Sequence, residues 1–129
     1  DDSYFYSIEA DSITLGIHYA YDSSLLMARK SALTNDPIEQ ALNTYTSYLD
    51  QVIGGQIISQ STITTNGKIG REIHATYYDS GSPLVLRRIY MRVYWDGNNM
   101  HVFSLEAKTT FDTTLAIYKD MVFNSIQFN

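Results

Sequence analysis

The residues best suited to chemistry in this sequence lie at every second position of one apolar-rich stretch, residues 84–95. Period-two alternation there predicts a strand, and one face of it carries the residues we call the Arg/Tyr row: Arg88, Tyr90, Arg92 and Tyr94, with Arg71 from a neighbouring strand. Arginine binds carboxylates through paired hydrogen bonds and stacks on aromatic rings, so the row predicts a surface for an acidic ligand or a protein partner. The structural alternative is that a helix or a ladder of tyrosines covers the row and that its arginines pair with Glu72 or with aspartates. Arg–Tyr pairs across strands are common on sheet faces.

Histidine is the next candidate for chemistry. His18, His74 and His101 each fall in a predicted strand, and no two of them have the short spacing of a zinc-binding pair such as HxxxH. The sequence contains no cysteine, which excludes disulfides, thiolate catalysis and thiolate metal sites. We therefore expect structural histidines, with no metal site and no cofactor.

Catalytic motifs are absent from the sequence. No GxSxG elbow occurs, and the serines of residues 80–82 fall in a predicted loop. Gly67 and Gly70 follow a predicted turn instead of leading from a strand into a helix, so we assign them to turn geometry and not to phosphate binding. The sequence thus predicts a protein that is not an enzyme. The alternative is a small enzyme or ligand-binding domain with a pocket between sheet and helix that uses His74 or His101.

Composition and net charge limit the classes of partner that the chain is expected to bind. The 129 residues are 44% hydrophobic and include 11 Tyr, which indicates one folded, sheet-rich domain spanning residues 1–129. The net charge is −5 with only 9 Lys and Arg, so nucleic-acid binding is not expected. No apolar run approaches the roughly 18 residues of a membrane-spanning helix. The first residue is Asp1 and not Met, which indicates a removed targeting segment or a trimmed domain edge.

Two helices and six strands should position these residues. Asp36-Pro37 predicts a helix start and Gly54-Gly55 its end. Asn66-Gly67 predicts a tight hairpin turn. A second helix should run from Asp112 or Thr113 to about Asn124, with an apolar stripe of Leu115, Tyr118, Met121 and Val122. The strands are expected at residues 4–8, 13–21, 56–65, 69–78, 84–95 and 100–108, with a short final strand at 125–128. The order ββ-α-ββββ-α predicts an α+β fold with one antiparallel sheet flanked by helices.

The sequence of residues 36–128 resembles the PsbP-like superfamily, which includes extrinsic photosystem proteins and the bacterial DcrB-like lipoproteins. The resemblance rests on segments 49–54, 66–73, 87–94, 96–99, 101–105 and 121–128, which read LDQVIG, NGKIGREI, RRIYMRVY, DGNN, HVFSL and MVFNSIQF. Ile126 stands where such proteins often carry Phe, and the first 35 residues add no matching motif.

This resemblance implies an α/β/α sandwich fold. It also implies that the protein is secreted or periplasmic, and some members of the superfamily carry a lipid anchor on the precursor. It brings no common catalytic residues. We therefore expect a non-enzymatic binding or accessory module with a protein or small acidic ligand as partner. Its candidate surfaces are the Arg/Tyr row and the loops at residues 79–83 and 96–99. A further hypothesis is homodimer formation through an exposed edge strand, residues 4–8.

Overall fold

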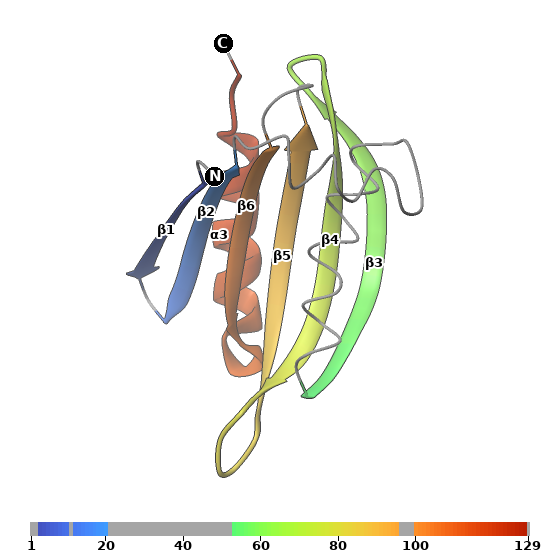
Figure 1. Ribbon diagram of the computed structural model, residues 1–129. Coiled ribbons are helices and arrows are strands. Elements are labelled where there is room, and N and C mark those ends of the chain that lie inside the picture. The colour runs from blue at the N-terminus through green and yellow to red at the C-terminus, as the bar shows by residue number, and fades with distance from the viewer. Residues whose placement is uncertain (1–2, 11, 21–52, 96–99, 129) are drawn as a thin grey trace.

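The computed structural model describes residues 3–10, 12–20, 53–95 and 100–128. They form one six-stranded antiparallel sheet in the order β1-β2-β6-β5-β4-β3, followed by a C-terminal helix (Figure 1). The elements are β1 (Ser3–Ala10), β2 (Ile13–Ala20), β3 (Ile53–Thr65), β4 (Lys68–Asp79), β5 (Val85–Trp95), β6 (Met100–Lys108), the short 3-10 helix η1 (Thr109–Phe111) and α3 (Asp112–Asn124). The α+β class is confirmed. The predicted helix at 36–52 and the predicted turn at 96–99 lie outside the described residues, so α3 is the one α-helix of the described part.

Two hairpins follow directly from local sequence. β1 pairs with β2 through a turn in which Ser12 has a φ of 66°. β3 pairs with β4 through Asn66-Gly67, with φ angles of 52° and 78°, and Thr65 lies opposite Lys68. Positive φ at both central residues is the backbone of a type I′ turn, which Asn-Gly adopts at low cost. Both predicted hairpins are confirmed.

β3 begins earlier than the sequence predicts. Gly54, expected to end a helix, lies inside the strand with a φ of 64°, and the register with β4 shifts between Ile53 and Gln56. An added Cβ at Gly54 would lie 2.9 Å from Cδ2 of Tyr78. Helix ends and strand bulges both place glycine in the left-handed region, so the same sequence signal serves either structure.

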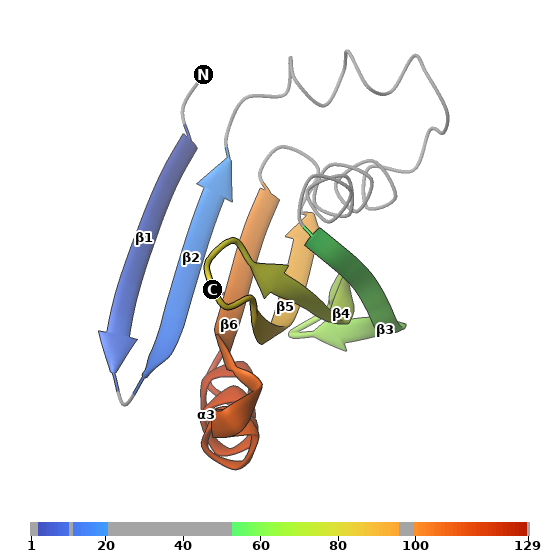
Figure 2. The same ribbon diagram turned by 90° about the horizontal axis from the view of Figure 1, so that it is seen from below.

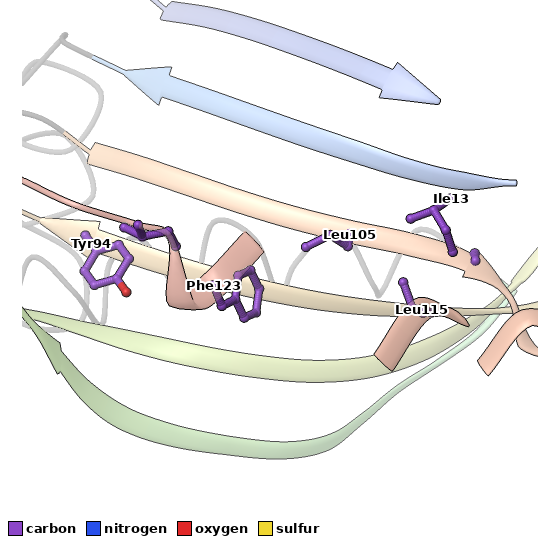
Figure 3. Close-up of a cluster of buried hydrophobic side chains, with 7 residues drawn as sticks. Ile13, Tyr94, Leu105, Leu115 and Phe123 are labelled. Atoms are coloured by element: carbon purple, nitrogen blue, oxygen red, sulfur yellow. The ribbon is translucent and has the colours of Figure 1, made fainter. Parts of the chain in front are cut away.

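α3 lies against one face of the sheet, over β6 and β5 (Figure 2). Leu115 and Phe123 are its buried residues, whereas Met121 is 61% exposed. The predicted apolar stripe was therefore wrong at Met121 and missed Phe123. Figure 3 shows the core on this face of the sheet, which consists of Ile13, Tyr94, Leu105, Ala107, Leu115, Phe123 and Ile126.

The predicted final strand at 125–128 is also wrong. Ser125 and Ile126 continue the chain as a turn, with backbone N–H groups donating to the carbonyls of Val122 and Phe123. Ile126 then enters the core, and the Phe128 ring lies 4.9 Å from the Tyr94 ring. The apolar side chains of this segment pack in the core, but its backbone does not pair with the sheet. The alternation of apolar residues here therefore reflects packing and not a strand.

The opposite face of the sheet carries a second cluster. Ile73, Ala75 and Tyr77 of β4 are buried there, with Ile89 and Met91 of β5 packed against them. Because neighbouring positions of a strand face opposite ways, residues that alternate with this cluster point toward α3.

Candidate functional site

The sheet register places most of the Arg/Tyr row beneath α3. Tyr90 lies opposite Leu105, and Arg88 lies opposite Ala107, two residues of the core that α3 covers. Directly opposed residues share a face, so the row points toward the helix. Tyr94, at 0% exposure, is part of that core. The row is thus partly internal to the fold.

Arg88 joins the first residue of α3 to the sheet. Its Nε donates to Oδ1 of Asp112 over 3.0 Å, and its Nη2 donates to Oδ2 over 3.4 Å. Its Nη1 lies 2.6 Å from Nε2 of His74 on β4. Asp112 also places negative charge at the positive end of the helix dipole. The start of α3 is therefore held to β5 by a bidentate ion pair.

Arg92 performs the same task at the other end of α3. Its Nε donates to Oε1 of Glu72 over 2.9 Å, and its Nη1 to the Tyr94 hydroxyl over 3.3 Å and the Phe123 carbonyl over 3.4 Å. The guanidinium lies 4.6 Å from the centre of the Phe123 ring. Burial alone would lower the pKa of Arg92, but the hydrogen bonds to Glu72 and Tyr94 outweigh it and raise the pKa. A cation is favourable at a helix C-terminus, so this contact stabilises α3.

The remaining members of the row divide between the two faces. Tyr90 stacks on His74, with ring centres 4.6 Å apart, and lies under the ammonium of Lys119. Arg71 lies opposite Val93 and Thr62, on the face away from α3, and is not brought together with the others. The arrangement matches the structural alternative, in which a helix covers the row and carboxylates pair with its arginines. A ligand for the row stays a prediction.

Gly70 lies where Tyr94 needs room. It is opposite Tyr94 in the β4–β5 ladder, and the Tyr94 hydroxyl reaches Oγ1 of Thr65 at 2.8 Å. Its assignment to turn geometry was wrong, because Gly70 is inside β4 and, of the two glycines Gly67 and Gly70, Gly67 alone has a positive φ. A glycine in a strand often marks the close approach of another group, here an aromatic ring.

His74 is neutral by environment. Burial first, and then the Arg88 guanidinium, lower its pKa from 6.5. Arg88 donates to Nε2, so this nitrogen must be an acceptor and the proton resides on Nδ1. Asp112 lies beyond Arg88, so the arginine separates the imidazole from that carboxylate.

The lowered pKa of His74 predicts a pH dependence of stability. The unfolded chain takes up a proton at His74 more readily than the folded chain, so the stabilisation is complete above the unfolded pKa of 6.5 and is lost as pH falls below it. We expect urea unfolding to show a smaller stability loss for His74→Gln than for the wild type between about pH 7.5 and 5.5. The carboxylates contribute equally in the wild type and in His74→Gln. Equal losses of stability in the two proteins would therefore contradict a lowered pKa of His74.

The other two histidines add no cluster. His101 lies 5.4 Å from the Phe128 ring, and the His18 side chain is outside the described residues. Among the side chains that the structure describes, no group of three or more His, Asp or Glu could hold a metal ion.

The loop between β4 and β5 is the candidate that extends away from the core. Every residue from Tyr78 to Leu84 is exposed, and the loop projects beyond the ends of the neighbouring strands (Figure 1, yellow). Its base is fixed on the face away from α3. Nη1 of Arg87 lies 3.8 Å from Oδ2 of Asp79, and its Nε lies 3.8 Å from Oε2 of Glu106. The Tyr77 hydroxyl donates to the same Glu106 oxygen. A projecting loop on a fixed stem is a common form of recognition surface.

Comparison with known proteins gives a fold and no function. No family model matches the chain, and no curated protein matches it. The solved structure of cyanobacterial PsbP (CyanoP) from Synechocystis sp. PCC 6803 superimposes with a TM-score of 0.61 over 93% of this chain and 69% of that chain, at 12% identity. The chain has a PsbP-like fold.

A second solved structure also resembles the chain in fold. It is PA94 from Pseudomonas aeruginosa, a protein of unknown function, with a TM-score of 0.73, 6% identity and coverage of 99% of this chain and 83% of that chain. Both identities are low, so the shared feature is architecture and not a set of site residues. No helix in the described ranges of the chain is long and apolar enough to cross a membrane.

Proposed function

We propose that this chain is a non-enzymatic binding or accessory module that works outside the cytoplasm and recognises a protein partner through its β4–β5 loop. The observation that carries the proposal is the projection of the exposed residues 80–84 from a stem anchored by Arg87, Glu106 and Tyr77. A fixed stem limits the conformational entropy that the loop loses on binding.

The loop is a better candidate than the Arg/Tyr row. Arg88 and Arg92 already donate to acceptors within the chain, so a ligand carboxylate would have to replace Asp112 or Glu72 and loosen α3. Leu84, by contrast, is 49% exposed, and its neighbour Pro83 restricts the backbone. Binding at the loop would add apolar burial without breaking a contact of the core.

The PsbP-like fold supports the rest of the proposal. It favours a secreted or periplasmic location, with a lipid anchor on the precursor as one route. It also favours an α/β/α sandwich in the order ββ-α-ββββ-α. The alternative of a histidine-containing pocket has less support, because Nε2 of His74 is bonded to Arg88 and not to a carboxylate.

Site-specific photo-crosslinking tests the loop. A photoreactive phenylalanine analogue replaces Leu84 in one variant and Ile69, which is 54% exposed at the opposite end of β4, in the matched control. We expect a defined crosslinked protein from Leu84 in extracytoplasmic extract of the producing cells, and none from Ile69. We also expect Leu84→Ser to weaken capture of that protein about tenfold, since a hydrophobic anchor contributes on the order of 1–2 kcal/mol.

Stability controls separate binding from folding. Leu84→Ser and Ile69→Ser should both melt within a few degrees of the wild type, because exposed side chains contribute little to stability. Crosslinks of equal strength from Leu84 and Ile69 would overturn the loop as the recognition surface.

A further inference from the structure

β3 forms one edge of the described sheet, and its chemistry is unusual for an edge. It has 13 residues, pairs with β4 alone among the described strands, and contains no charged residue and no proline. Residues 58–62 and Thr64 are exposed. Sheet edges are normally protected from pairing by lysine, proline or bulges. The bulges of β3 lie before Ser59, and from Ser59 to Thr65 its register with β4 is continuous.

The hairpin turn determines which backbone groups of β3 point outward. Thr65 and Lys68 flank the two-residue turn, so they form a hydrogen-bonded pair. Hydrogen-bonded and non-hydrogen-bonded pairs alternate along an antiparallel ladder. The N–H and C=O groups of Gln60, Thr62 and Thr64 therefore point away from β4, along the edge that no other described strand pairs with.

We propose that β3 pairs antiparallel with β3 of a second copy of this chain, about a two-fold axis at Thr62. In this register Thr62 lies opposite Thr62 of the partner copy, and Gln60 lies opposite Thr64 in both directions. Every outward N–H and C=O group of these residues then gains a partner. The two sheets become one continuous sheet across the interface.

The chemistry of the edge fits a second copy better than another partner. The chain has a net charge of −5, yet β3 has none, so two copies meet here without like-charge repulsion. Opposed threonines are a favourable cross-strand pair. The other described edge, β1, includes the exposed Glu9, and pairing of β1 with β3 would give an open, growing filament instead of a closed dimer.

Charge reversal at the axis tests the register. Thr62→Lys and Thr62→Glu each place two like charges opposite one another, and we expect each to weaken dimerisation at least about tenfold in sedimentation velocity over a concentration series. Mixing the two variants should restore a dimer, because Lys then faces Glu. Thr110→Lys, at an exposed position on η1, is the matched charge control and should dimerise like the wild type.

A cysteine at the same position gives an independent result. The chain has no cysteine, so Thr62→Cys introduces a single thiol. Opposed residues of a hydrogen-bonded pair have Cα atoms about 5.5 Å apart, within the range of a disulfide. We expect mild oxidation to yield a covalent dimer of Thr62→Cys and much less of one for Thr64→Cys. A wild type that stays monomeric up to its solubility limit, or a Thr62→Lys variant that dimerises like the wild type, would overturn the proposal.

Discussion

Phe123→Ala is expected to lower the free energy of unfolding by about 3–5 kcal/mol, the usual cost of removing a buried aromatic side chain. Phe123 is 2% exposed and belongs to the core between α3 and the sheet. Its ring also lies under the Arg92 guanidinium, at 4.6 Å. The substitution leaves a cavity at the helix–sheet interface and removes this cation–π contact.

Met121→Ala is the matched comparison on the same helix. Met121 is 61% exposed, so its truncation should change the free energy of unfolding by less than about 0.5 kcal/mol. Urea denaturation of both variants measures the difference. Equal losses, or a larger loss at Met121, would mean that α3 presents a different face to the sheet.

Gly70→Ala should have the second largest effect. A Cβ at this position would lie 2.6 Å from the Val93 carbonyl oxygen and 2.7 Å from Cδ1 of Tyr94. The carbonyl belongs to the neighbouring strand and cannot move without breaking the β4–β5 ladder, and the Tyr94 ring is fully buried. We expect a loss of roughly 1–3 kcal/mol, the typical cost of overpacking.

Gly81→Ala is the control for Gly70→Ala. Gly81 lies in the exposed β4–β5 loop, and a Cβ there would be 3.4 Å from the Pro83 carbonyl oxygen, an ordinary van der Waals contact. Thermal unfolding followed by circular dichroism should show a clear drop in Tm for Gly70→Ala and almost none for Gly81→Ala. A Gly70→Ala variant as stable as the wild type would show that Tyr94 and Val93 can shift together.

Local signals predicted most of the sheet. Period-two alternation located β5 and β6, and Asn66-Gly67 fixed the β3–β4 hairpin because its residues adopt positive φ. The helix from Asp112 to Asn124 was also predicted with its bounds. In each case the local structure is determined by interactions within a few residues of the chain.

The orientation of α3 depended on contacts far away in sequence. Its apolar side chains surround the helix, including the exposed Ile117 and Met121, so their spacing does not select a buried face. The ion pair of Arg88 with Asp112 and the contact of Arg92 with Phe123 do select it. Arg71 was grouped with the Arg/Tyr row because local sequence does not give the register between β4 and β5.

The strand order has a consequence for how the chain is made. β2 pairs with β6, and Thr14 lies opposite Glu106 near the other end of the sequence. During synthesis the β1–β2 hairpin leaves the ribosome long before its neighbour exists, at about 5–20 residues per second. The hairpin must therefore wait with an open edge, whereas β3 to β6 can pair in turn as they emerge. Completion of the sheet is therefore expected to be a late event, because the β2–β6 pairing closes the longest loop among the described strand pairs.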